Sequence, residues 1–318
     1  MQHFLFVHFK ERRTPDGEQI YFAVSPDGFK WEAINGGQPV LWAVLNEKGV
    51  RDATIVRSDN GKFYIIATDL SLAYNMRRVY NNDWHKVQRE GSSSLMMWES
   101  EDLLHWSEEK ELKVRPVGSG CAWAPDIIRD KEAGEWVLHW SSPNPDRDMR
   151  MCIWYTRTKD FEHFSDAKIL YEKEDSGVID SCMVQEGEWF YLFVKSDRNP
   201  CSVILLRSKS VTGPFERMTA FDPEMEKLAG GPGKYEAPTC TKVSDGSYNL
   251  MLDFFGVAGK GQGYVPFHSD DISTGVFKRA DGDFSYPYGF KHGTMLAITE
   301  AEYEAIKAFD YDAESYNR

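Results

Sequence analysis

Asp180-Ser-Cys-Met-Val, at residues 180–184, is one of five short runs that begin at a nearly constant spacing along this chain. The other runs begin at Asp52, Ala124, Glu236 and His292, and the last four starting positions lie 56 residues apart. Asp52 precedes Ala124 by 72 residues, which is one period plus a 16-residue insertion. A fixed period of this length is typical of β-propellers, in which each repeat forms one blade. Equivalent positions on the blades face one axis, so we expect two aspartates, a glutamate and a histidine to meet there.

Each repeat contains further strand signals that support this architecture. A glycine-containing turn and a second apolar strand follow four of the runs, at residues 61–67, 134–140, 187–193 and 246–252. A third strand then leads into a polar turn that ends in an aromatic residue, as in Ser25-Pro-Asp-Gly-Phe-Lys-Trp31. Such an aromatic residue can fill the gap between neighbouring blades.

The two ends of the chain complement each other. Residues 3–10 and 19–25 resemble strands that have no inner strand before them, whereas residues 292–298 resemble an inner strand with no outer strands after it. Pairing the two ends in one blade would remove exposed sheet edges. We therefore expect an all-β, five-bladed β-propeller, a single domain over residues 1–318, closed by its N- and C-terminal strands. A helix is expected only at residues 300–308.

Composition argues against several kinds of partner. The formal net charge of −13 disfavours binding to nucleic acid or to an anionic membrane. No apolar stretch approaches the roughly 18 residues of a membrane-spanning helix. The five cysteines are odd in number and form no CxxC pair, and the N-terminal residues lack a signal-peptide pattern. We expect a cytoplasmic protein, or a secreted or periplasmic one if a leader has been removed.

Three carboxylates on one axis indicate a particular chemistry. Asp52, Asp180 and Glu236 would repel one another, which a fold tolerates only where the cluster is useful. Hydrolysis of a glycosidic bond needs one carboxylate to activate water and one carboxylic acid to protonate the leaving oxygen. Burial and a neighbouring carboxylate raise the pKa of such an acid and keep it protonated. Each residue alone could be a solvated turn residue, but their shared place in the repeat favours a catalytic set.

The run sequences resemble the blade signatures of glycoside hydrolase family 43. They are Val50-Arg-Asp-Ala-Thr-Ile-Val, Trp123-Ala-Pro-Asp, Val178-Ile-Asp-Ser, Tyr235-Glu-Ala-Pro and Lys291-His-Gly-Thr. The resemblance implies a five-bladed propeller that acts on arabinose- or xylose-containing glycans with inversion at the anomeric carbon. It also implies that Asp52 is the general base, that Asp180 raises the pKa of the acid and positions it, and that Glu236 is the general acid.

The chain departs from the usual family pattern at four positions. Ala53 and Ser181 replace prolines, Ala237 replaces a glycine after the presumed acid, and Lys291 replaces an arginine. None of these changes removes a carboxylate. However, Ala237 adds a methyl group and Lys291 lacks the bidentate fork of arginine. These departures bear on the identity of the substrate more than on the class of reaction.

Further residues are expected near the substrate, namely Arg51, Trp84, Trp123, Asp126, Phe254 and His292. Trp84 belongs to the insertion, roughly residues 71–93, which either forms a wall of the binding site or packs on itself. Trp123 either stacks on a sugar or plugs a blade interface, and Asp126 is either a substrate ligand or a buried structural acid. His292 matches an axial histidine that in the family often lies near calcium or water, although a core or substrate-contacting role is equally compatible. We expect no required cofactor, with a structural calcium in the channel, held mainly by water, as an option.

The sequence therefore predicts an inverting glycoside hydrolase of the α-L-arabinofuranosidase or β-xylosidase type, with a carbohydrate as its partner. Two alternatives stay within enzymes: a propeller glycosidase of other specificity, such as a galactosidase, and a glycoside phosphorylase. A phosphorylase would need several basic groups at the axis, which is acidic here. A third alternative, from another class, is a carbohydrate-binding propeller that has lost catalysis, motivated by Ala53, Ala237 and Lys291.

Overall fold

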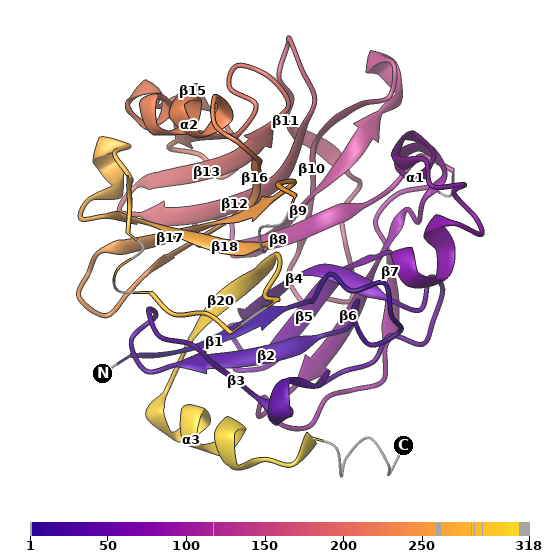
Figure 1. Ribbon diagram of the computed structural model, residues 1–318, viewed down its shortest axis with the longest axis vertical. Helices are drawn as coiled ribbons and strands as arrows, with labels where there is room; N and C mark the ends of the chain where they lie inside the picture. The colour runs from indigo at the N-terminus through magenta and orange to yellow at the C-terminus, as the bar shows by residue number, and fades with distance from the viewer. Residues whose placement is uncertain are drawn as a thin grey trace.

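The computed structural model of this chain describes residues 2–116, 118–258, 262–280, 282, 284–287 and 289–311. Its strands form five four-stranded antiparallel sheets arranged as the blades of a propeller (Figure 1). The inner strands contact one another in a closed ring, in the order β20 (Gly293–Ile298), β4 (Val50–Arg57), β8 (Trp123–Asp130), β12 (Val178–Glu186) and β16 (Lys234–Lys242). The predicted five-bladed β-propeller is therefore confirmed.

The outer strands of each blade follow in chain order. Behind β20 lie β1 (His3–His8), β2 (Tyr21–Ser25) and β3 (Glu32–Ala33), and behind β4 lie β5 (Phe63–Asp69), β6 (Ser94–Ser100) and β7 (Lys110–Lys113). Behind β8 lie β9 (Glu135–Asn144), β10 (Arg150–Thr158) and β11 (Lys168–Tyr171). Behind β12 lie β13 (Trp189–Ser196), β14 (Val203–Ser208) and β15 (Glu216–Arg217). Behind β16 lie β17 (Tyr248–Phe255), β18 (Gly263–Ser269) and β19 (Lys278–Arg279).

The ring is closed by the two ends of the chain. Strand β1 pairs antiparallel with β20 in a register that runs from His3 opposite Ile298 to His8 opposite Gly293. This blade combines one C-terminal and three N-terminal strands, as predicted from the incomplete strand sets at the two ends. The pairing leaves no gap in the ring of inner strands, so the central axis is enclosed by five blades.

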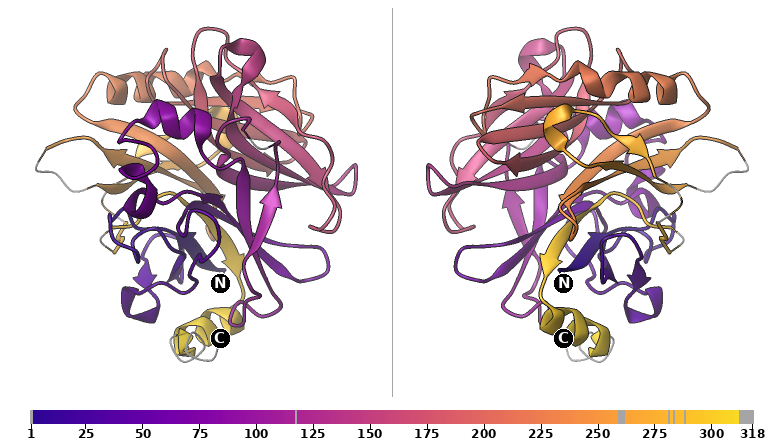
Figure 2. Two further views of the ribbon diagram at one scale, coloured as in Figure 1. Left: turned by 90° about the vertical axis from the view of Figure 1, so that its right-hand side faces the viewer. Right: turned by 90° about the vertical axis from the view of Figure 1, so that its left-hand side faces the viewer.

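Three α-helices in the described ranges lie outside the sheets. The expected C-terminal helix is α3 (Glu300–Ala308), which begins with a capping box at Thr299 and lies on the outside of the molecule against β1 (Figure 2). The expectation of a single helix is wrong, because α1 (Trp84–Glu90) and α2 (Asp222–Ala229) are also present. Short helical turns occur at η1 (Asn35–Gly37), η2 (Leu72–Met76), η3 (Pro145–Arg147), η4 (Thr219–Phe221) and η5 (Ile272–Thr274). None of the helices in the described part of the chain is long and apolar enough to span a membrane.

Hydrophobic side chains fill the spaces between blades. Trp106, at the end of one polar turn, is 5% exposed and packs in a core with Phe22 of the neighbouring blade. Trp31 and Phe277 occupy similar inter-blade cores, as their place in the repeat predicted. The insertion has a small core of its own around Leu72 and Tyr80, so it is a folded element on the rim of the propeller.

Candidate active site

Four inner strands are interrupted near their starts by a β-bulge. At each bulge one residue has a positive φ: Asp52 (52°), Ala124 (48°), Asp180 (51°) and Ala237 (54°). The last of these lies 57 residues after Asp180, so the equivalent residue on β16 is Ala237 and the expectation that Glu236 continues the 56-residue phase is wrong by one position. A bulge changes the direction in which a strand presents its side chains, which makes this difference relevant to the site.

Glu236 reaches the axis from the position before the bulge. In the sheet registers it is equivalent to Arg51, Trp123 and Ile179, each of which is the last residue paired before the register shifts. All four of these residues line the central cavity. On three of these blades two adjacent positions line the cavity, at Arg51 and Asp52, at Ile179 and Asp180, and at Glu236 and Ala237. Glu236 and Asp180 therefore approach the axis from different positions.

The central cavity has a volume of about 530 Å³. The three predicted catalytic residues Asp52, Asp180 and Glu236 all line it, together with His292 and a fourth carboxylate, Asp253. The structure thus brings the predicted catalytic set together at one place, enclosed by the inner strands.

Asp52 is held in its ionised form by its neighbours. Its Oδ1 lies 3.3 Å from Nδ1 of His292, and its Oδ2 accepts a hydrogen bond of 3.0 Å from Thr68. Burial alone would raise the pKa of Asp52, but the hydrogen bond and charge of His292, the charge of Arg51 and the hydrogen bond from Thr68 outweigh it and leave the pKa below its ordinary value. Asp52 is therefore an anion that can accept a proton.

Glu236 has the opposite tendency. Burial, followed by the negative charges of Asp180 and Asp253, raises the pKa of Glu236 to about 8, although Lys291 and Lys195 oppose the increase. A carboxyl group with this pKa carries its proton at neutral pH. The same cavity thus contains an ionised carboxylate and a protonated carboxylic acid, which is the division of roles that general base and general acid catalysis requires.

The pKa of Asp180 lies above that of Asp52 and below that of Glu236. Burial raises its pKa to about 6, with the charge of Asp52 acting in the same direction and the charge of His292 against it. Its Oδ2 accepts a hydrogen bond of 3.2 Å from the backbone N–H of Ala237, the residue next to Glu236. Asp180 therefore both carries charge close to Glu236 and fixes the backbone from which Glu236 projects.

Four of the six residues expected near the substrate line the cavity: Arg51, Trp84, Trp123 and His292. The rings of Trp84, from helix α1, and Trp123 make an edge-to-face contact with centroids 6.2 Å apart. The insertion therefore does both things that were considered for it, because it packs on its own core and also contributes a wall of the cavity.

Asp126 and Phe254 do not lie on the cavity wall, so the structure corrects both expectations. The carboxylate of Asp126 is 8% exposed and joins two other blades, accepting hydrogen bonds from Thr54 Oγ1 at 3.2 Å and from the backbone N–H of Met183 at 2.9 Å. It is the buried structural acid of the two alternatives. Phe254 packs instead against Tyr235, with ring centroids 5.2 Å apart, because consecutive residues of a strand point to opposite faces.

The residues around His292 do not fit a directly bound metal ion. Burial alone would lower the pKa of His292, but its bond to Asp52 and the charges of Asp52, Asp180 and Asp253 raise the pKa to about 9. A protonated imidazole has no lone pair to offer a cation. Among the described residues, no cluster of three or more histidine, cysteine, aspartate or glutamate side chains is arranged to hold a metal.

Sequence reasoning missed two carboxylates of the cavity, Glu11 and Asp253. Asp253 is paired with Glu236 in the register of β16 and β17, a relation that depends on the bulge and is not visible in the residue spacing. Glu11 lies between β1 and β2, where no repeated motif marks it. Burial raises the pKa of Asp253, with Lys291 acting against the increase.

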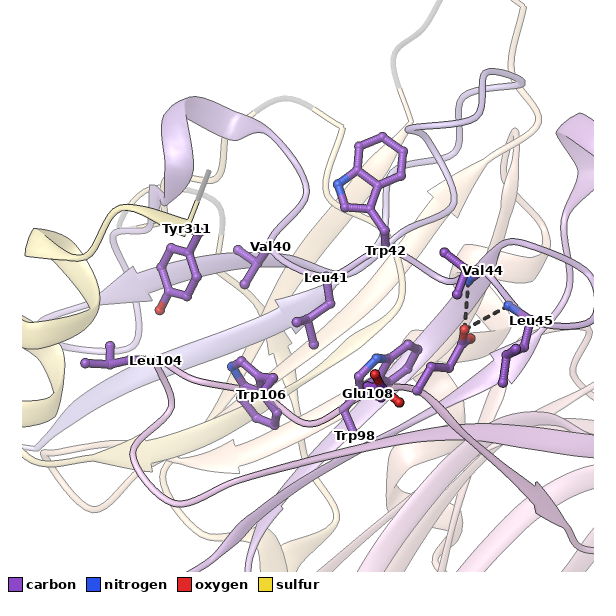
Figure 3. A pocket seen from close by; sticks show the side chains of 11 residues that line it. Val40, Leu41, Trp42, Val44, Leu45, Trp98, Leu104, Trp106, Glu108 and Tyr311 are labelled. Carbon is purple, nitrogen blue, oxygen red and sulfur yellow. Dashed lines mark hydrogen bonds between the residues drawn. The ribbon is translucent and has the colours of Figure 1, made fainter. Parts of the chain in front are cut away.

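A larger hollow, of about 630 Å³, lies elsewhere on the molecule (Figure 3). Its walls are mainly apolar and include Trp42, Trp106 and Tyr311. One carboxylate oxygen of Glu109 accepts hydrogen bonds from the backbone N–H groups of Val44 and Leu45, at 2.7 and 2.9 Å. This hollow contains no set of carboxylates comparable to that of the central cavity, so the chemistry and not the volume identifies the candidate active site.

Several known proteins are similar to this chain in sequence or in fold. An α-L-arabinofuranosidase from Bifidobacterium longum subsp. longum is 27% identical over 290 residues, which cover 77% of this chain and 26% of that protein. The chain therefore spans about a quarter of the length of this relative. Solved structures with the same fold include a xylan β-1,4-xylosidase from Bacillus halodurans (TM-score 0.58, 16% identity, 83% of this chain and 51% of that one). They also include the catalytic domain of an α-L-arabinofuranosidase from Coprinopsis cinerea (TM-score 0.56, 13% identity, 80% and 76%).

The model of a family related to glycoside hydrolase family 43, described as a probable glycosyl hydrolase domain, matches residues 1–304. This match covers all five blades and every residue that lines the central cavity. The resemblance inferred from the blade motifs is thereby confirmed. The chain belongs to this family of glycosyl hydrolases related to family 43.

Proposed function

We propose that the central cavity hydrolyses α-L-arabinofuranosides or β-D-xylosides with inversion at the anomeric carbon. The observation that carries the proposal is the convergence of Asp52 and Glu236 in one cavity, where the neighbours of Asp52 lower its pKa and those of Glu236 raise its pKa. The relatives named as arabinofuranosidases and as a xylosidase support this choice of sugar. The alternative is another glycoside, since the fold of an exo-β-1,3-galactanase is also similar (TM-score 0.50).

In the proposed reaction, a water molecule attacks the anomeric carbon from the side opposite the leaving group. Asp52 removes a proton from this water as the new carbon–oxygen bond forms, and Glu236 donates its proton to the glycosidic oxygen as that bond breaks. The products are a sugar with inverted anomeric configuration and the free alcohol of the leaving group. Asp180 transfers no proton; it keeps the pKa of Glu236 high and holds the adjacent peptide in place.

The aromatic wall favours action at a chain end. Trp84 and Trp123 stand on one side of the cavity, and the insertion that carries Trp84 has a folded core. A wall of this kind limits how far a glycan can extend beyond the cleaved residue. We propose exo-action, with release of one pentose per event and no metal requirement.

A panel of aryl glycosides tests the proposal. Wild-type protein is incubated with aryl α-L-arabinofuranosides, β-D-xylosides and β-D-galactosides, and the anomeric form of the first product is followed by NMR. Glu236→Gln and Asp52→Asn should each lower kcat by about 10²- to 10⁴-fold, the contribution of one general acid or base, while the protein stays folded.

The outcomes separate the alternatives. Near-normal activity of either variant, or a product of retained configuration, refutes the proposed roles. Turnover that requires inorganic phosphate would identify a phosphorylase. Sugar binding by calorimetry without turnover of any glycoside would identify a binding protein, and loss of activity on treatment with EDTA would contradict the absence of a metal requirement.

A further inference from the structure

We propose that Glu11 and Asp253, bridged by Lys291, form a clamp that binds hydroxyl groups of the sugar ring whose glycosidic bond is cleaved. The inference rests on the proposed function, because it takes the central cavity as the site of a pentose. It adds two substrate-binding carboxylates, neither of which belongs to the acid–base pair.

Lys291 holds the two carboxylates together. It is 3% exposed, its Nζ makes an ion pair with Oδ2 of Asp253, and it lies 3.6 Å from Oε2 of Glu11. The same Oε2 oxygen lies 3.3 Å from Nη2 of Arg51. All four side chains line the central cavity. Glu11 and Asp253 are therefore fixed on the cavity wall by two cations, each through one oxygen atom.

The second oxygen of each carboxylate is available to a ligand. Oδ1 of Asp253 is buried and has no hydrogen-bond partner among the residues that the structure describes. Oε1 of Glu11 takes part in none of the hydrogen bonds and ion pairs within that part of the chain, and the side chain is 32% exposed. A buried carboxylate oxygen without a donor is costly, so such an atom on a cavity wall indicates that a ligand or water supplies the donor.

The charges around the clamp select a neutral ligand with hydroxyl donors. Arg51 pairs with Glu11 and also with Glu18, and Lys291 pairs with Glu11 and Asp253. A cationic ligand would meet a guanidinium and an ammonium group already in place, and an anionic ligand would face the carboxylates. Arg51 and Lys291 also hold the pKa of Glu11 below its ordinary value against the effect of burial. An ionised Glu11 can only accept hydrogen bonds. Hydroxyl groups of a pentose that are not part of the glycosidic bond are donors of this kind.

Asp253 also lies at the right place on the wall. It is paired with Glu236, the proposed acid, across β16 and β17. A hydroxyl bound to Asp253 would therefore be on the sugar ring that Glu236 protonates at its glycosidic oxygen. The clamp would orient the ring for that proton transfer.

Comparison of Glu11→Gln with Glu18→Gln tests the clamp. Glu18 is also bound to Arg51, at 3.1 Å, but is 1% exposed and does not line the cavity, so it controls for the loss of a negative charge beside Arg51. In Glu11→Gln, Arg51 keeps its ion pair with Glu18 and Lys291 keeps its ion pair with Asp253, so the protein should still fold. The values of kcat/KM are measured on the preferred aryl pentoside and on its analogues that each lack one ring hydroxyl.

On the parent substrate, Glu11→Gln should lower kcat/KM about tenfold, the difference between a charged and a neutral hydrogen-bond acceptor. On the analogue that lacks the bound hydroxyl, this loss should shrink to about twofold or less, because the interaction no longer exists. Any loss in Glu18→Gln should be the same on every analogue. Asp253→Asn should show the same dependence for a different hydroxyl.

An equal loss on all analogues for both Glu11→Gln and Asp253→Asn would overturn the clamp and leave a structural role only. If Asp253→Asn does not fold, as judged by circular dichroism, Glu11→Gln alone decides. If the wild-type protein cleaves no pentoside, the proposed function fails, and calorimetric binding of L-arabinose, D-xylose and their deoxy forms to wild type and Glu11→Gln then tests the clamp separately. Deoxy-dependent loss of affinity supports it, and uniform loss or no binding refutes it.

Discussion

The most direct test of the acid–base assignment is a measurement of stability and not of rate. Glu236 lies half-buried on the cavity wall, and its pKa of about 8 lies well above that of an exposed glutamate. In the unfolded chain the same carboxyl group loses its proton near its ordinary pKa. Between these two pH values the folded state holds a proton that the unfolded state does not, so stability falls as the pH rises. Glu236→Gln, which cannot ionise, should lack this decline.

The size of the effect follows from the width of that pH window. One proton held by the folded state alone lowers the free energy of unfolding by about 1.4 kcal/mol per pH unit. Between pH 5 and pH 8 the wild type should therefore lose on the order of 4 kcal/mol relative to Glu236→Gln. Urea unfolding of both proteins at pH 5, 6, 7 and 8 measures this difference directly. In the same window the high-pH limb of kcat/KM of the wild type should have its midpoint near pH 8.

Glu304→Gln provides the control, because Glu304 is an exposed residue on α3 that does not line the cavity. Its stability should follow that of the wild type at every pH. A difference between wild type and Glu236→Gln that stays constant from pH 5 to pH 8 would show that Glu236 ionises as easily in the folded protein as in the unfolded chain. Glu236 could not then be the group that carries a proton to the leaving oxygen.

The remaining predictions concern the base, the aromatic wall and the bulge. His292→Gln should shift the low-pH limb of kcat/KM to higher pH, because Asp52 loses the partner that keeps its pKa low; an unchanged limb would show that Asp52 is not the base. Trp84→Ala should raise KM about tenfold if the indole contacts substrate. Trp42→Ala removes an equally exposed tryptophan (both 45%) outside the cavity and should leave KM unchanged; equal effects would refute the aromatic wall. Ala237→Gly should increase the free energy of unfolding by up to about 1 kcal/mol, because the φ of 54° at this position strains a residue with a Cβ, and a decrease in urea denaturation would contradict this account.

The number of blades and the closure of the ring were predictable because both depend on long-range regularities that the sequence repeats. The strand pattern recurs with each blade, and the incomplete strand sets at the two ends leave one way to complete the fifth sheet. Helix α2 was not predictable from this pattern. It begins with Pro223 in its first turn and buries Met225 and Leu228, and eight residues are too few for a clear helical period beside strong strand signals.

The candidate site was predictable in its members and not in its geometry. Counting in steps of 56, with a 16-residue insertion after Asp52, found Asp52, Asp180 and Glu236, because the inner strands present two adjacent positions to the axis and either one brings a side chain into the cavity. The bulge that distinguishes the two positions is a backbone feature with a weak sequence signal. For the same reason Asp253 escaped notice, since its pairing with Glu236 depends on the register that the bulge sets.

The positive-φ residue of β16 is Ala237, one position after Glu236. This one-residue difference explains how Asp180 and Glu236 act together. On two blades, the N–H of the positive-φ residue is held by a hydroxyl from the second strand of the preceding blade: Thr68 binds Ala124 at 2.7 Å, and Ser141 binds Asp180 at 2.8 Å.

For the positive-φ residue Ala237 of β16, the preceding blade has Lys195 at the position that Thr68 and Ser141 occupy in the other two cases. The ammonium group of Lys195 bonds to Asp197 at 2.8 Å and cannot accept a hydrogen bond from the N–H of Ala237. Asp180 takes over that role and accepts the N–H of Ala237. If Glu236 itself had the positive φ, this hydrogen bond would hold the peptide nitrogen of the acid. Because Ala237 has it, Asp180 binds the peptide that follows the acid, and the Glu236 side chain stays free to reach the glycosidic oxygen. Loss of the Asp180 side chain should therefore misplace the acid as well as lower its pKa, so that Asp180→Ala, which has no acceptor for the N–H of Ala237, reduces kcat at every pH and does not merely shift the high-pH limb.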